Sequence, residues 1–138
     1  MARVKVAAVQ MSCSRNVQEN IDKADKLVRK AASEGAQVIL LPELFERQYF
    51  CQERRYDYYD FAKPVSENDA VAHFSKLAAE LNVVLPISFY EKAGNVLYNS
   101  CVITALCSSL FVPEGQLSSC DMHSTLYLVV TCGWLNTL

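Results

Sequence analysis

The segment that decides the fold is Gly35-Ala36-Gln37-Val38-Ile39-Leu40-Leu41-Pro42-Glu43-Leu44-Phe45. Its apolar centre, residues 36–41, has the length and flanks of a central strand, with a glycine before it and a proline after it. Pro42 lacks a backbone N–H and therefore ends the hydrogen-bonded ladder. The segment predicts a strand that delivers the carboxylate of Glu43 at its carboxyl end.

A helix and an earlier strand precede this segment. Apolar residues recur at steps of three and four and share one helical face: Val17, Ile21, Ala24, Leu27, Val28 and Ala31. Ser14 or Asn16 can cap the helix, and Gly35 stands where helices often end in the left-handed conformation. Residues 3–10 are apolar and rich in valine, which predicts a strand buried at its centre. Residues 3–41 thus predict a strand-helix-strand unit with parallel strands and a right-handed crossover.

The chain beyond this unit predicts further elements. Residues 46–59 are aromatic and charged without clean periodicity, so we expect a loop with a short helix. Asn68 precedes a second amphipathic helix, whose inward residues are Val71, Phe74, Leu77, Ala78 and Leu81. Residues 83–90 predict a third strand, in which Pro86 favours an edge position or a bulge. Residues 91–95 then connect it to a strand over 96–102, which is a hairpin pattern.

Composition limits the class of protein. The chain has 138 residues, half of them apolar, which suffices for one domain with a core. A net charge of −2 with interspersed signs gives no polybasic surface for nucleic acid or lipid, so a small organic partner fits better. The apolar stretch at residues 4–9 is too short for a signal-peptide core or a membrane span, so we expect a cytoplasmic protein with no membrane partner. The six cysteines lack metal-binding spacing and predict free thiols.

Glu43 is the candidate catalytic residue. In open α/β sheets, ligands gather at the carboxyl ends of parallel strands. Between Pro42 and the apolar pair Leu44 and Phe45, we expect the carboxyl group to be partly desolvated, as suits a general base. Spacing alone favours the alternative, a solvated loop glutamate.

A resemblance to a known family favours the catalytic role of Glu43 over the solvated loop glutamate. The segments that carry it are Val6-Ala7-Ala8-Val9-Gln10-Met11, Asn20, Gly35-Ala36, Leu40-Leu41-Pro42-Glu43-Leu44-Phe45, Ser88-Phe89-Tyr90 and Tyr98-Asn99-Ser100. Their order and spacing resemble the N-terminal half of the nitrilase superfamily of carbon-nitrogen hydrolases, over residues 3–103. Within it, Glu46, residues 49–51 and residues 86–91 resemble the N-carbamoylputrescine amidase branch.

The resemblance implies a fold, a chemistry and a set of partners. The fold is α/β, a partial α-β-β-α sandwich of the nitrilase type, and family members form homo-oligomers. The family uses a Glu-Lys-Cys triad, in which the glutamate, here Glu43, takes the proton of a cysteine that attacks the carbamoyl carbon. The lysine stabilises the oxyanion. The implied substrate is a carbamoyl amide, N-carbamoylputrescine, hydrolysed to putrescine, ammonia and carbon dioxide in polyamine biosynthesis, with no cofactor and no metal. Tyr49 resembles a pocket-lining aromatic and is the candidate substrate-binding residue, with plain packing as its alternative.

The chain departs from the family pattern after about residue 103. No lysine follows Lys92, and the region of the family lysine reads Leu106-Cys107-Ser108-Ser109-Leu110-Phe111-Val112-Pro113. The family's Cys-Trp-Asp segment belongs beyond residue 138. Cys132-Gly133-Trp134 echoes it by coincidence, and Cys51 is interpreted as a loop or packed thiol. We therefore expect a truncated chain that is inactive alone.

Several alternatives stay open. We assign residues 1–103 to the N-terminal part of the hydrolase domain and residues 104–138 to a divergent tail of frameshift or intron origin, in which residues 126–130 could form a strand. The missing second sheet would leave an apolar face exposed. Other functions to consider are an amidase for another linear carbamoyl amide or ω-amide, a fragment that binds full-length subunits, and a thiol-rich binding protein. His73 and His123 are interpreted as structural or exposed.

Overall fold

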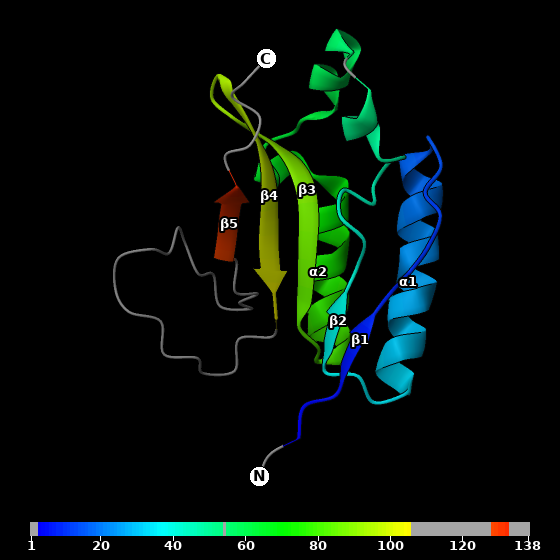
Figure 1. The fold of residues 1–138 in the computed structure, drawn as a ribbon. Helices are drawn as coiled ribbons and strands as arrows, with labels where there is room; N and C mark the ends of the chain where they lie inside the picture. Colours follow the sequence, from blue (N-terminus) through cyan, green and yellow to red (C-terminus); the bar gives the residue numbers. More distant parts are fainter. Residues whose placement is uncertain (1–2, 54, 106–127, 133–138) are drawn as a thin grey trace, which may run out of the picture.

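The computed structural model describes residues 3–53, 55–105 and 128–132 (Figure 1). The described elements are β1 (Val6–Ala8), α1 (Val17–Ser33), β2 (Val38–Leu40), α2 (Asp69–Leu81), β3 (Leu85–Ala93), β4 (Val96–Thr104) and β5 (Leu128–Cys132). Residues 46–59, predicted as a loop with a short helix, form a loop that contains the 3-10 helix η1 (Phe50–Gln52) and most of a second, η2 (Tyr56–Phe61). A third 3-10 helix, η3 (Val65–Glu67), follows and was not predicted. No helix in the described part of the chain has the length and apolar character needed to cross a membrane.

The N-terminal unit forms as its sequence predicts. Strands β1 and β2 pair in parallel, with Ala7 opposite Ile39, and α1 connects them. Asn16 caps α1, because its side chain accepts hydrogen bonds from the backbone N–H groups of Gln18 and Glu19. The helix ends where Gly35 adopts a φ of +89°, which a glycine reaches without steric cost.

Pro86 lies two residues after the point where the chain entering β3 contacts β2. A single parallel bridge joins Val38 to Val84, with Val84 N donating to the Gln37 oxygen and Ile39 N donating to the Val84 oxygen. The next donor on that side of β3 would be residue 86, and proline has no N–H to offer. The predicted loss of a ladder donor is confirmed, and Pro86 leaves the β3–β4 ladder on the other side unbroken.

The hairpin between β3 and β4 is tighter than predicted. Its ladder runs without a bulge from the pair Leu85–Thr104 to the pair Ala93–Val96, so the turn is Gly94-Asn95 and the five-residue connection was wrong. Gly94 has a φ of +61°, which suits a two-residue hairpin turn. The strand extends through Glu91 to Ala93, and the buried Glu91 carboxylate accepts a hydrogen bond of 2.5 Å from the Ser100 hydroxyl.

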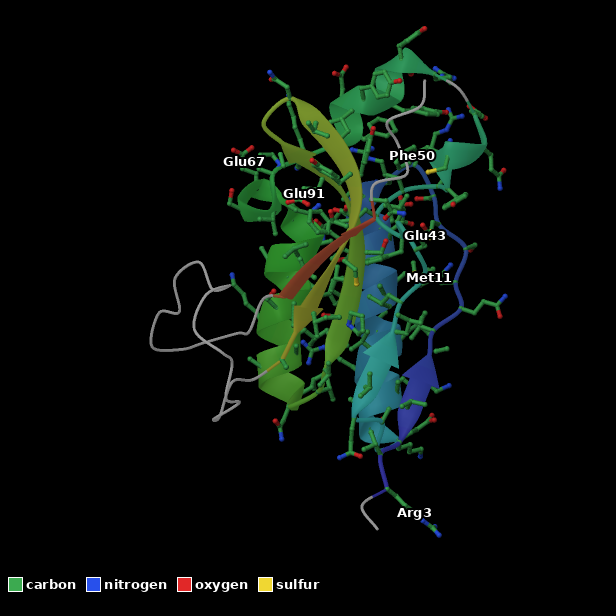
Figure 2. The ribbon with its side chains drawn as sticks, turned by 60° about the vertical axis from the view of Figure 1, so that its left-hand side comes forward. Arg3, Met11, Glu43, Phe50, Glu67 and Glu91 are labelled. Atoms are coloured by element: carbon green, nitrogen blue, oxygen red, sulfur yellow. The ribbon has the colours of Figure 1, made fainter. Side chains whose placement is uncertain are left out.

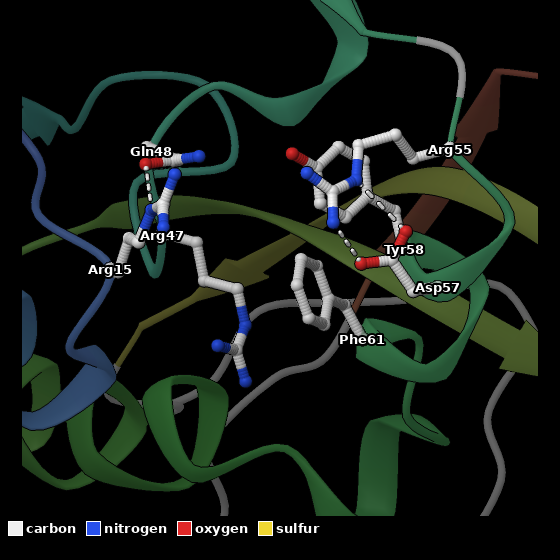
Figure 3. Close-up of a pocket in the computed structure, with 7 residues that line it drawn as sticks. All are labelled: Arg15, Arg47, Gln48, Arg55, Asp57, Tyr58 and Phe61. Atoms are coloured by element: carbon white, nitrogen blue, oxygen red, sulfur yellow. Dashed lines mark hydrogen bonds and ion pairs between the residues drawn. The ribbon is translucent and has the colours of Figure 1, made fainter.

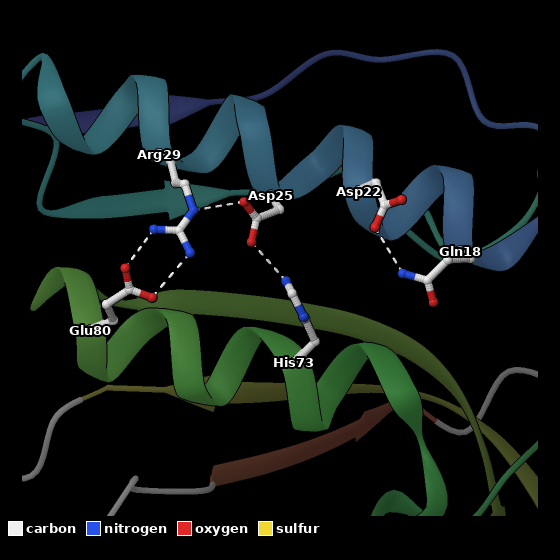
Figure 4. A network of polar contacts seen from close by, with 6 residues as sticks. All are labelled: Gln18, Asp22, Asp25, Arg29, His73 and Glu80. Carbon is white, nitrogen blue, oxygen red and sulfur yellow. Dashed lines mark hydrogen bonds and ion pairs between the residues drawn. The ribbon is translucent and has the colours of Figure 1, made fainter.

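Both helices pack on one face of the sheet and enclose the core (Figure 1). The largest fully buried side chains of this core are Val28, Ile39, Phe45, Phe74, Leu77, Leu85, Ile87, Phe89 and Val102. On the outer side, α1 and α2 are bridged by two contacts (Figure 4). The Arg29 guanidinium pairs with Glu80 at 2.6 Å, and the His73 imidazole contacts Asp25 at 2.8 Å. The predicted inward face of α2 is confirmed, with Leu81 partly buried at its end.

The opposite face of the sheet is exposed at β1 and β2. Val6 is 70% exposed and Leu40 52% exposed, so the predicted burial of the first strand's centre is wrong. Side chains alternate along a strand, and only those directed to the helices, such as Ile39, are covered by described residues. β5 confirms a strand near residues 126–130, and it pairs with β4, so that its backbone widens the sheet.

Candidate active site

Glu43 lies just past the carboxyl end of β2, on a turn that its two neighbours anchor (Figure 2). Leu44 is 3% exposed and packs with the aromatic cluster of Phe50, Tyr58 and Tyr90, whereas Phe45 is fully buried against α2. Leu44 adopts a φ of +51°, a left-handed conformation that costs a non-glycine residue about 1–2 kcal/mol. Such strain is typical of functional turns. Here it lets two consecutive apolar side chains enter the interior while Glu43 points outward.

The carboxylate of Glu43 is held through both oxygens. Asn99 Nδ2 donates to Oε1 at 2.5 Å, and the Tyr49 hydroxyl donates to Oε2 at 3.5 Å. Ser88 orders this arrangement, since its hydroxyl donates to Asn99 Oδ1 at 3.4 Å and accepts from the Leu44 backbone N–H at 3.2 Å. The hairpin therefore fixes both the strained turn and the carboxylate that the turn presents.

The expected partial desolvation of Glu43 is wrong for the described residues. Glu43 is exposed, because Leu44 and Phe45 turn away from it into the core and do not enclose it. The expected position at the carboxyl end of the strand is correct. The carboxylate is thus oriented by hydrogen bonds and open to solvent, so that an approaching group can reach it.

Tyr49 and Cys51 lie near Glu43. Tyr49 is 46% exposed, and partial burial together with the negative charge of Glu43 raises the pKa of its phenol. Partial desolvation and the same carboxylate raise the pKa of the Cys51 thiol. A thiol with a raised pKa stays protonated at neutral pH, so Cys51 supplies no ready thiolate. It lies exposed in η1, as the loop interpretation predicts, and the role of Tyr49 in substrate binding stays a prediction.

A buried amide ties the turn at Glu43 to α1. Asn20 is 1% exposed; its Oδ1 accepts from Ser14 N at 2.8 Å, and its Nδ2 donates to the Ser14 and Glu46 carbonyl oxygens at 2.8 and 2.9 Å. The Glu46 carboxylate in turn accepts from Asn68 Nδ2 at 3.0 Å, and burial raises the pKa of this carboxyl group. The loop after Glu43 is therefore hydrogen-bonded to both helices.

Sequence reasoning assigned no role to the residues that position Glu43. Asn20, Ser88 and Asn99 entered only as matches to a family pattern. For Asn20 the signal was available, because a polar residue on the apolar face of a helix requires buried hydrogen-bond partners. For Ser88 and Asn99 the signal was strand alternation, which places both on one face of the hairpin.

The remaining candidates are not part of this site. His73 pairs with Asp25, which is 48 residues away and could not be found from spacing. Cys13, Cys51 and Cys101 are free thiols, as predicted, and the described residues contain no group of three or more potential metal ligands. Cys132 belongs to β5, while Gly133, Trp134 and His123 lie outside the described residues.

Comparison with known proteins decides the family. A family model described as carbon-nitrogen hydrolase matches residues 5–114. The chain belongs to the carbon-nitrogen hydrolase family. The predicted resemblance to the nitrilase superfamily is thereby confirmed. The assignment of residues 104–138 to a divergent tail stays a prediction.

The chain is also similar in sequence to individual carbon-nitrogen hydrolases. It is 49% identical over 102 residues to an N-carbamoylputrescine amidase of Oryza sativa subsp. japonica, covering 74% of this chain and 34% of the relative. It is 44% identical over 100 residues to a citrullinase of Francisella tularensis, covering 72% of this chain and 35% of the relative. The chain thus spans about a third of the length of these relatives.

A solved carbon-nitrogen hydrolase supports the fold. The crystal structure of the Helicobacter pylori G27 protein aligns with a TM-score of 0.67 and 28% identity, over 74% of this chain and 35% of that one. The predicted α/β class of the nitrilase type is confirmed. The described residues supply one helical layer and one layer of strands, in which the β1–β2 pair and the β3–β4–β5 sheet are joined by the Val38–Val84 bridge.

Proposed function

We propose that the chain provides the general base of an amidase that hydrolyses N-carbamoylputrescine. The observation that carries the proposal is the turn at Glu43, where a strained and anchored backbone presents a carboxylate held by Asn99 and Tyr49. The N-carbamoylputrescine amidase of Oryza sativa supports the choice of substrate.

In this proposal Glu43 accepts the proton of a cysteine thiol, and the thiolate attacks the carbamoyl carbon. Ammonia leaves, and water then releases the carbamoyl group as carbon dioxide and the free amine. The described residues orient the base, Glu43. Asn99 donates a hydrogen bond to Oε1, Ser88 holds the Asn99 amide, and Tyr49 donates to Oε2. We infer that the family's cysteine and its oxyanion-stabilising lysine have no counterpart among residues 1–138. We therefore propose that residues 1–138 alone do not turn over the substrate.

A chimaera tests the proposed role of Glu43. Residues 5–105 would replace the matching segment of the Oryza sativa enzyme, and ammonia release from N-carbamoylputrescine would be measured. We expect an active chimaera whose kcat falls at least about 10²-fold in the Glu43→Gln variant, because general-base assistance is lost. Glu67→Gln, at an exposed glutamate, is the matched control and should leave kcat unchanged. Equal activity of the Glu43→Gln and parent chimaeras would refute the role.

Citrulline is the second substrate to test. The citrullinase relative is 44% identical to this chain, nearly as similar as the amidase relative. Citrulline carries the same terminal carbamoyl group on a chain that ends in an amino acid in place of an amine. A chimaera with higher kcat/KM for citrulline would move the assignment to that substrate.

A non-catalytic role is favoured by the exposed sheet face. Val6 and Leu40 are more than half exposed, and apolar side chains gathered on a sheet face favour a protein contact. In this alternative the fragment binds full-length subunits of a related enzyme. Co-purification of the tagged chain with the Oryza sativa enzyme would support it, and a clean monomer in the same mixture would exclude it.

A further inference from the structure

Three arginines line a pocket to which the reaction above assigns no role (Figure 3). The pocket has a volume of about 270 Å³, and its lining residues are Arg15, Arg47, Gln48, Arg55, Asp57, Tyr58 and Phe61. These residues come from the loop before α1, the loop after β2 and the segment around η2. With three guanidinium groups and one carboxylate, the lining carries an excess of two positive charges.

Two of the guanidinium groups have N–H donors without a partner among residues 3–53, 55–105 and 128–132. Arg15 bonds only through Nε, to Gln48 Oε1 at 3.1 Å, and its terminal nitrogens contact no acid among the described residues. Arg47 lies over the Phe61 ring, 4.2 Å from its centroid, and makes no side-chain hydrogen bond within the described part of the chain. Stacking holds the Arg47 guanidinium in place while all its N–H groups stay available.

Arg55 differs from these two because it is neutralised. Its guanidinium binds Asp57 in a bidentate pair, with distances of 3.0 and 2.8 Å. It also lies 5.1 Å from the centroid of the Tyr58 ring. The pocket thus combines two cations that form no ion pair within the described part of the chain, a third that is paired with Asp57, and apolar walls from Tyr58 and Phe61.

We propose that this pocket binds a small organic oxyanion, a carboxylate or phosphate carried on an apolar body. Guanidinium groups match the two oxygens of such an anion, and charge-assisted hydrogen bonds are the strongest kind. The aromatic walls bury the body of the ligand, as is usual for small-molecule sites. The site is separate from the residues that contact Glu43.

The test measures binding to the full chain by calorimetry, with four probes: inorganic phosphate, phenyl phosphate, benzoate and neutral benzamide. We expect saturable binding of phenyl phosphate or benzoate that weakens as salt is added, since the contact is between charges near the surface. The tighter of these two probes identifies the anion as phosphate or carboxylate. Absence of saturation with both, or equal binding of benzamide, overturns the proposal.

Three variants locate the site. Arg15→Gln, at an exposed position, should weaken anion binding about tenfold by loss of one charge-assisted contact, and Arg47→Gln should do the same or more. Arg3→Gln removes the same charge from an exposed position outside the pocket and should change the affinity less than about twofold. Asp57→Asn should tighten binding because it releases Arg55. Equal losses of anion affinity in Arg15→Gln and Arg3→Gln would show that binding depends on net charge, and would overturn the proposal that this pocket binds the anion.

Discussion

The side-chain amide of Asn99, on β4, donates to the carboxylate of Glu43 at 2.5 Å across 56 residues of sequence. Ser88 donates to the oxygen of the same amide, which directs the amide nitrogen toward Glu43. The geometry of the candidate base is thus set by a hairpin that follows it by some fifty residues.

Asn99 is a positioning residue, and its removal should lower kcat. In the chimaera described above, we expect Asn99→Ala to lower kcat about 10- to 100-fold with little change in KM, because Glu43 loses its orientation and not its charge. Asn95→Ala, in the exposed hairpin turn, is the control and should behave like the parent. Steady-state ammonia release measures both constants. A change confined to KM would instead place Asn99 in substrate binding.

The left-handed backbone at Leu44 should reverse the usual stability order of alanine and glycine variants, in which alanine is the more stable. Leu44→Ala should lower the free energy of unfolding by about 3 kcal/mol, because a buried side chain is lost while the strain remains. Leu44→Gly loses the same side chain but relieves about 1 kcal/mol of strain, so it should be no less stable. At Ala72, an exposed position inside α2, glycine should cost about 1 kcal/mol. Urea unfolding of the variants checks the order, and a Leu44→Gly variant clearly weaker than Leu44→Ala would contradict it.

Asn20 should be among the most sensitive polar positions. Its buried amide serves three backbone groups of Ser14 and Glu46. Asn20→Leu leaves those groups without their partner, which should cost about 2–4 kcal/mol of unfolding free energy. Lys26→Leu, at an exposed site of the same helix, should change stability by less than about 0.5 kcal/mol. Similar unfolding midpoints for the two variants would show that water replaces the lost bonds.

Glu46 should make stability depend on pH. Burial raises the pKa of its carboxyl above the ordinary value of 4.5, so the folded chain holds this proton more tightly than the unfolded chain. Stability therefore falls as pH rises from 4.5 through the folded-state pKa. Glu46→Gln removes the titration, and its amide oxygen can still accept from Asn68. We expect this variant to be more stable than the parent at neutral pH, with the difference vanishing toward pH 4.5.

Urea unfolding across this pH range measures the Glu46 effect. Glu67→Gln, at an exposed glutamate, serves as control and should show no such pH-dependent difference from the parent. A Glu46→Gln variant that is less stable at neutral pH would show that the charged carboxylate contributes more through Lys63 and Arg47 than burial costs.

Local sequence patterns predicted most of the helices and strands. They predicted less well which side chains are covered and where the paired strands end. The apolar spacing of α1 and α2, the caps at Asn16 and Asn68 and the left-handed Gly35 all act within a turn or two of chain. The exposure of Val6 was mispredicted, because burial of a strand depends on what covers it, and composition carries no information on that cover. The hairpin turn was placed too early because pairing continues past Glu91, which lies opposite Tyr98 and accepts a hydrogen bond from the Ser100 hydroxyl on the neighbouring strand.

The sequence by itself determined the order of elements, the family and the position of Glu43 directly after a strand, because those features follow from apolar periodicity, from Pro42 and from a contiguous motif. The tertiary structure alone decided that Glu43 is exposed, that Asn99 holds it and Ser88 orients Asn99, that His73 contacts Asp25, and that Arg15 and Arg47 share a pocket. The physical reason is that hydrogen bonds and charge interactions depend on distance in space, and these pairs are brought together by chain folding across 11 to 56 residues of sequence.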